Sequence, residues 1–209
     1  MKSKEYRNDP LFLRNEFDSD NQWGFAIIEK KSLDLDSIEL ISCADISSKD
    51  TNNLQKGIHH FVDDYRFEGL YSHPYRCINT YSKYRFALTP DYSLYSEMNL
   101  WRQIESVGKS RWVGANWQKH GITVIATVSW GQPSSYSFCF DGIEKHSIVA
   151  VGMIGCKQSR PSYMRGYYAM LEAIEPEAVI CLGTPFPEME GHIIPVDYIS
   201  SRRVKRNGR

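Results

Sequence analysis

Acidic side chains follow apolar segments of this sequence, at positions where a parallel sheet would present them to a ligand. The apolar segment 85–89 ends at Pro90, and Asp91 comes next. In parallel α/β sheets, ligands bind beyond the carboxyl ends of the strands. An aspartate at such an end can ligate a metal ion, act as a base or accept a hydrogen bond. We therefore expect Asp91 to act at a site, the alternative being a polar residue that only caps its strand.

A second acidic group lies in the segment HHFVDDYRFE. On a helix, His60, Asp64 and Glu68 would be four residues apart and share one face, a spacing that could hold a divalent cation. Asp63 and Asp64 are also adjacent, as in acid pairs that bind Mg²⁺ or Mn²⁺. The alternative is a solvated helix end in which Arg66 pairs with a carboxylate.

Aromatic and basic side chains next to these acids suggest substrate contacts. Arg111 and Trp117 lie in a segment with helical character, where they could stack bases or sugars. Trp130 follows the apolar segment 122–129, and Tyr92 adjoins Asp91. The alternative for the tryptophans is packing of a helix onto its sheet, or filling of the core.

Hydrophobic patterning predicts the elements that must position these residues. Buried strands are predicted at residues 38–43, 85–89, 122–129, 147–154, 178–182 and 192–196, and a short strand at 23–29. Helices are predicted at residues 53–64, 97–119 and 161–175, with a loop and short helix at 71–84. Strands that alternate with helices indicate β-α-β units. The predicted fold is a single α/β domain with a largely parallel sheet flanked by helices, either open or partly barrel-like.

Composition limits the class of protein. The 209 residues include 25 basic and 25 acidic side chains, so the formal net charge is zero. This balance excludes a protein that depends on a strong basic field over its whole surface. The predicted organisation is an arm at residues 1–20, the α/β domain at 21–200 and a basic tail at 201–209. The tail could contact phosphates or be passive.

Further patterns concern compartment and cofactor. The five cysteines form no CxxC pair, so we interpret them as reduced, mostly buried residues rather than metal ligands or disulfides. The opening residues have no apolar core of a signal peptide, and no stretch has the roughly 18 apolar residues of a membrane span. These features predict a cytoplasmic protein. Dinucleotide, P-loop, serine-hydrolase and zinc-protease signatures are absent from the sequence.

Five segments in order resemble a known family: DDYRFE (63–68), LTPDYSLY (88–95), RWVGANWQ (111–118), TVSW (127–130) and FCFDG (138–142). They are similar to domain-of-unknown-function family 4417, over about residues 61–198. The resemblance implies an intracellular setting in bacteria, mainly Firmicutes, and in their phages and mobile elements. It assigns no catalytic role to any residue.

Together these features predict a metal-dependent enzyme that acts on a nucleic acid or nucleotide phosphate. Asp64 and Asp91 would ligate Mg²⁺ or Mn²⁺, with help from Glu68 or Asp141, while Trp130 or Trp117 would stack the base. Neutral net charge favours a nucleotide or a single strand over a duplex. A factor that binds a small molecule or host protein without turnover, and a hydrolase of a non-phosphate small molecule, remain alternatives.

Overall fold

The computed structural model describes residues 3–201. Its centre is a curled sheet of seven parallel strands. The strands are β1 Leu40–Ser42, β2 Gly57–His59, β3 Phe86–Leu88, β4 Val124–Thr127, β5 Ile148–Gly152, β6 Ala178–Leu182 and β7 Ile193–Val196. Each strand pairs in parallel with the next one along the chain. The predicted α/β domain with a largely parallel sheet is therefore confirmed, and its sheet has the shape of a half-barrel.

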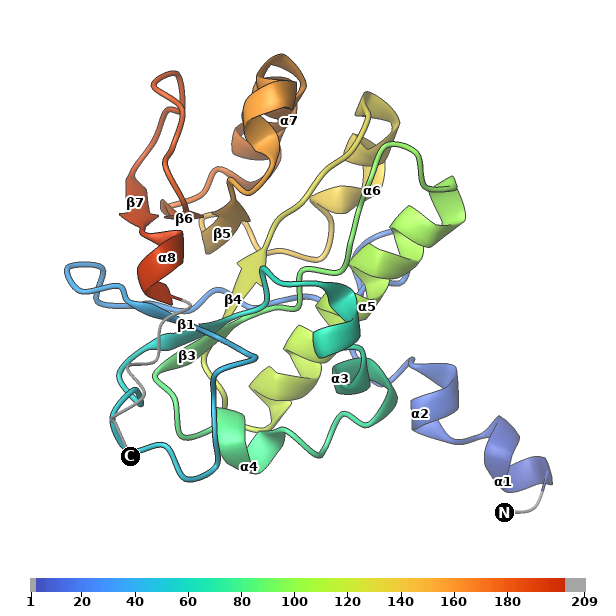
Figure 1. The fold of residues 1–209 in the computed structure, drawn as a ribbon. Helices are drawn as coiled ribbons and strands as arrows, with labels where there is room; N and C mark the ends of the chain where they lie inside the picture. The colour runs from blue at the N-terminus through green and yellow to red at the C-terminus, as the bar shows by residue number, and fades with distance from the viewer. Residues whose placement is uncertain (1–2, 202–209) are drawn as a thin grey trace.

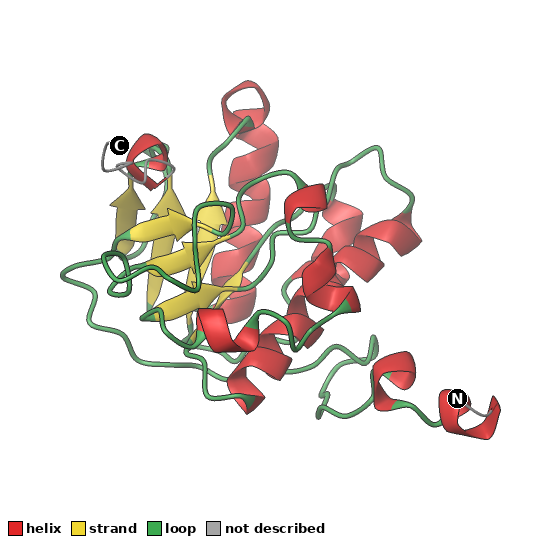
Figure 2. Ribbon diagram, turned by 60° about the horizontal axis from the view of Figure 1, so that its bottom comes forward, coloured by secondary structure: helices red, strands yellow, loops and turns green. Residues whose placement is uncertain are grey.

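Helices lie between most of the strands, and the two longest cover one face of the sheet (Figures 1 and 2). The longest are α5 Leu100–Lys119 and α7 Arg160–Ile174. Shorter ones are α1 Ser3–Arg7, α2 Pro10–Leu13, α3 Gly69–Ser72, α4 Ile78–Tyr81, α6 Tyr136–Cys139 and α8 Tyr198–Ser201, with 3₁₀ turns η1 Asp64–Arg66, η2 Pro133–Ser135 and η3 Cys156–Ser159. No helix within residues 3–201 is long and apolar enough to cross a membrane.

Both faces of the sheet are apolar, because side chains alternate in direction along each strand. In β5, Val149 and Val151 pack toward the helices, whereas Ile148 and Ala150 belong to a cluster on the other face. That second cluster includes Leu40 of β1 and Val196 of β7. The half-barrel therefore buries its concave face largely against its own strands, and its polar loops are left at the strand ends.

The helix predicted at residues 53–64 is wrong, because strand β2 occupies residues 57–59. The apolar residues from Leu54 to Val62 have helical spacing, but they also fit a short buried strand. Gly57 is required there: a Cβ atom at this position would lie 2.2 Å from the Phe86 ring of β3. His60, Asp64 and Glu68 consequently do not share one face of a helix.

Other differences are local. The strand predicted at residues 23–29 is reduced to a single bridge between Ile28 and Ile143. Residues around Cys139 form helix α6, and Cys139 is buried as expected. The domain boundaries remain predictions, and residues 202–209 of the basic tail lie outside the described residues.

The N-terminal segment extends away from the body of the domain as α1 and α2 (Figures 1 and 2). It is attached at Arg14, whose guanidinium lies 4.2 Å from the ring centroid of Tyr71 and 3.9 Å from that of Trp112. The same guanidinium donates a hydrogen bond to the Tyr71 carbonyl oxygen. A cation between two aromatic rings is a stable anchor.

Candidate functional site

A cavity of about 910 Å³ opens at the carboxyl ends of the strands. Residues that follow β2, β3, β4, β5 and β7 line it, and we call it the strand-end cavity. Its acidic members are Asp63, Asp64, Asp91 and Glu97. Its aromatic members are Phe61, Tyr65, Tyr95, Trp130, Tyr163 and Tyr198. The position agrees with the rule that ligands bind at this edge of a parallel sheet.

Asp91 lies in this cavity directly after β3, as the sequence predicts. Ser129, at the end of the neighbouring strand β4, donates a hydrogen bond from its hydroxyl to Asp91 Oδ1. Burial raises the pKa of Asp91 to about 6, although the Ser129 hydrogen bond acts in the opposite direction. The negative charge of Asp64 raises the pKa further. The carboxyl group is therefore able to exchange a proton near neutral pH.

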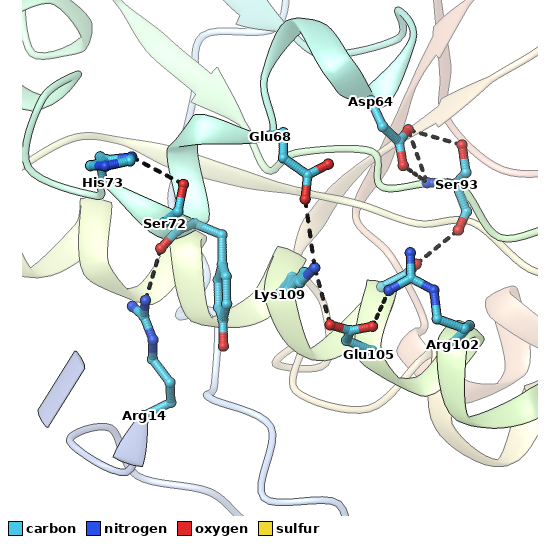
Figure 3. A network of polar contacts seen from close by, with 11 residues as sticks. Arg14, Asp64, Glu68, Ser72, His73, Ser93, Arg102, Glu105 and Lys109 are labelled. Carbon is cyan, nitrogen blue, oxygen red and sulfur yellow. Dashed lines mark hydrogen bonds and ion pairs between the residues drawn. The ribbon is translucent and has the colours of Figure 1, made fainter. Parts of the chain in front are cut away.

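Asp64 is held by the loop that contains Asp91 (Figure 3). The backbone N–H of Ser93 lies 3.2 and 3.1 Å from the two carboxylate oxygens of Asp64. The Ser93 hydroxyl donates a third hydrogen bond, at 2.9 Å. These bonds tie the segment after β2 to the segment after β3, and so bring Asp64 and Asp91 into one cavity.

Aromatic rings form the remaining walls. The Trp130 ring lies against Tyr163 of α7, with 4.9 Å between ring centroids. Tyr65 and Tyr95 stand at the mouth of the cavity, with 72% and 62% of their surface exposed. Exposed tyrosine rings at a cavity mouth are suited to stack on a planar ligand.

The Trp130 wall depends on a glycine in α7. A Cβ atom at Gly166 would lie 2.1 Å from Trp130 Cδ1, so any larger residue must displace the indole ring. We expect Gly166→Ala to lower the free energy of unfolding by about 1–3 kcal/mol through overpacking. We also expect a shift in tryptophan fluorescence, whereas Gly69→Ala, which meets no atom within 4 Å, leaves the emission spectrum unchanged. Identical emission spectra for Gly166→Ala and wild type would contradict this packing.

Two predicted site residues lie elsewhere. Glu68 faces Lys109 of α5, with 3.9 Å between Oε1 and Nζ, and is not among the cavity residues (Figure 3). Asp141 follows α6, where burial raises its pKa, a Trp23 hydrogen bond lowers it and the Asp20 charge raises it. Within residues 3–201, no group of three or more histidine, cysteine, aspartate or glutamate side chains could hold a metal ion. The structure therefore brings together Asp64 and Asp91 alone among the predicted ligands.

Among the predicted substrate contacts, only Trp130 lies in the cavity, and the other three are buried elsewhere. Trp130 lines the cavity, but Trp117 is fully buried between the rings of His60 and Tyr81, at 5.5 and 4.9 Å between centroids. Arg111 is 2% exposed and lies inside the domain, and Tyr92 is 6% exposed behind the cavity. For Arg111 and Trp117, the structure has the packing arrangement that the sequence left open.

Several cavity residues were not predicted from the sequence. Ser93, Tyr65 and Tyr95 are near predicted acids in the chain, so proximity to Asp64 and Asp91 is the signal that points to them. Tyr163 carries no such signal, because its helix is amphipathic in the ordinary way. Only the three-dimensional arrangement shows that the first turns of α7 reach the same cavity.

Comparison with known proteins adds a family to this geometry. The model of the family described as domain of unknown function DUF4417 matches residues 17–199. The chain belongs to the DUF4417 family. Similar relatives are the Gene 1 protein of Mycobacterium phage L5, 38% identical over 129 residues, and that of Mycobacterium phage D29, 36% identical over 129 residues. The aligned part is 60% of this DUF4417 chain in both cases, and 56% and 48% of the relatives.

The chain thus spans about half the length of the curated relatives that it matches. No solved structure matches this DUF4417 chain. The family resemblance and its association with phages, both expected from the sequence, are confirmed.

Proposed function

We propose that this protein is an enzyme whose active site is the strand-end cavity, and that Asp91 is its acid–base group. The observation that carries the proposal is the position of Asp91 in the cavity with a pKa raised to about 6. An ordinary aspartate is fully ionised at neutral pH, whereas a carboxyl group with a pKa near neutrality both accepts and returns a proton. Strongly perturbed carboxyl groups in cavities are typical of catalytic sites.

The charge of the cavity indicates what a phosphate-bearing substrate would need in order to bind. Four carboxylates line it, and none of its described lining residues is lysine, arginine or histidine. A phosphate group would therefore need an accompanying cation. Mg²⁺ and Mn²⁺ are often held by one or two carboxylates together with the phosphates of the substrate. We assign that role to Asp64, which leaves Asp91 available for proton transfer.

The proposed substrate is a nucleotide or a short single-stranded nucleic acid. The rings of Tyr65, Tyr95 and Trp130 line the cavity and can stack on a base. A neutral protein suits such a ligand better than a duplex. The place of action that we propose is the cytoplasm of the bacterial host, which the similarity to phage proteins supports.

The test is binding of the metal and nucleotide by the full chain. We expect Mn²⁺ with a nucleoside triphosphate to raise the Tm of the wild type by about 5–10 °C at a hundredfold excess over Kd. Asp64→Asn should remove most of this shift, and Glu68→Gln should retain it, because Glu68 lies outside the cavity. Turnover is followed by chromatography of the nucleotide products. An unchanged Tm shift in Asp64→Asn would exclude the assigned metal position.

A second candidate is a protein that binds an organic cation without turnover. The described lining of the cavity has aromatic rings and carboxylates but no basic side chain. Such a lining is suited to bind ammonium groups. Spermidine and tetramethylammonium are suitable probes. A Tm shift with either probe in the absence of Mn²⁺, with no product from any nucleotide, would favour this function over the enzyme.

A further inference from the structure

Two serine hydroxyls in the strand-end cavity are hydrogen-bonded to aspartates, Ser129 to Asp91 and Ser93 to Asp64. The two pairs differ in the hydrogen-bond donors that the carboxylate accepts. Asp64 also accepts the backbone N–H of Ser93 on both oxygens, so its charge is stabilised by donors other than the hydroxyl. The Asp91 side chain accepts its hydrogen bond from the Ser129 hydroxyl. Asp91 is therefore the carboxylate better suited to take a proton from its serine.

The geometry points to Ser129 as the nucleophile of this cavity, with Asp91 as its general base. Both residues line the cavity, both are partly exposed to it, and they follow the neighbouring strands β3 and β4 by three and two residues. Their hydrogen bond places the hydroxyl and the carboxylate in contact before any substrate binds. Nucleophile, base and accessible space are the combination that covalent catalysis requires.

The step can be written with its atoms balanced. The Ser129 oxygen forms a bond to the phosphorus of the substrate, its proton passes to Asp91, and the bond between phosphorus and the leaving oxygen breaks. Asp91 returns the proton to that leaving oxygen. A water molecule then attacks the phosphoserine phosphorus, gives a proton to Asp91, and the proton returns to the Ser129 oxygen as the phosphate leaves. This inference rests on the proposed enzymatic function of the same cavity.

Besides Ser129, three groups lie near enough to Asp91 to interact with its charge: Asp64 of η1, Cys156 of η3 and Tyr163 of α7. Burial raises the pKa of Cys156 to about 11 and raises that of Tyr163, so both remain uncharged near neutral pH. The Ser129–Asp91 pair therefore has two uncharged side chains beside it, those of Cys156 and Tyr163.

The experiment is labelling of the full chain with a fluorophosphonate probe, read by intact mass and by tandem mass spectrometry. The serine oxygen bonds to the phosphorus of the probe, and fluoride leaves. The labelling therefore does not require that the substrate be known. We expect a single adduct on Ser129, absent in Ser129→Ala and slowed about a hundredfold or more in Asp91→Asn. Ser162→Ala is the control: Ser162 lines the same cavity, and its hydroxyl is not hydrogen-bonded to a carboxylate in the described chain.

Each outcome decides between the possibilities. An adduct on Ser93, equal rates in Asp91→Asn and wild type, or no adduct on wild-type protein whose circular dichroism shows it folded would each overturn the inference. Nucleotide turnover without any adduct would retain the proposed function and make water the nucleophile. An adduct on Ser129 without phosphate turnover would retain the serine and reject the phosphate substrate.

Discussion

Replacement of Arg111 by methionine should lower the free energy of unfolding by about 3–5 kcal/mol. The guanidinium is 2% exposed and donates hydrogen bonds to three backbone carbonyl oxygens, of Asp141 at 3.0 Å, Thr127 at 3.2 Å and Cys139 at 2.8 Å. Burial lowers the pKa of Arg111 to about 10, so it is still charged at neutral pH. Methionine fills similar space but leaves the three carbonyls without this donor, each at a cost of about 1–3 kcal/mol.

Urea unfolding followed by circular dichroism measures this loss. Arg102→Met is the matched control, because Arg102 is exposed and its ion pair with Glu105 is a surface pair worth less than about 1 kcal/mol. A loss below about 1 kcal/mol in Arg111→Met would show that the carbonyls find other donors, and that Arg111 does not hold α5, β4 and the segment after α6 together.

Replacement of Asp91 by asparagine should stabilise the protein at alkaline pH, by about 1–3 kcal/mol at pH 8. The folded state raises the pKa of Asp91 from its ordinary 3.8 to about 6, so the folded protein resists ionisation of this group. The wild type therefore loses stability as the pH rises from about 4 to about 6 and does not regain it above. Asparagine carries no charge and can still accept the Ser129 hydrogen bond.

The difference between the two proteins should disappear near pH 4, where Asp91 is mostly protonated in the folded chain. Unfolding free energies at pH 4, 6 and 8 test this, with Glu97→Gln, an exposed carboxylate at the mouth of the cavity, as the control. A stability difference that does not change with pH would mean that Asp91 titrates normally. A stability gain that grows with pH, together with loss of the proposed acid–base chemistry, would be the trade-off expected if Asp91 acts in an active site.

The sheet could be predicted from the sequence because its strands are apolar on both faces and end at turn residues. Segments 122–129, 147–154 and 178–182 contain β4, β5 and β6 for this reason. Strand β2 could not be found, because three residues give no periodicity and the neighbouring apolar residues have helical spacing. Residue 57 must be glycine because the Phe86 ring of β3 lies against it. This contact joins two different segments, so no pattern in the local sequence indicates it.

The sequence predicted the place of some candidate site residues but not of others. Asp91 follows a strand, and the edge rule of parallel sheets places it correctly. Asp64 reached the same cavity by another route than predicted, through a 3₁₀ turn after β2 and its hydrogen bonds to Ser93. The directions of Arg111 and Trp117 could not be known, because a helix with polar and aromatic residues on several sides does not show which side is buried.

The order of the strands has a consequence for synthesis of the protein on the ribosome. Each strand pairs with the one translated just before it, so the sheet can grow one strand at a time as the chain emerges. The strand-end cavity does not form in this gradual way, since its walls come from residues between Phe61 and Tyr198. A nascent chain would therefore form most of its sheet before the walls of the strand-end cavity are complete, because one lining residue is Tyr198.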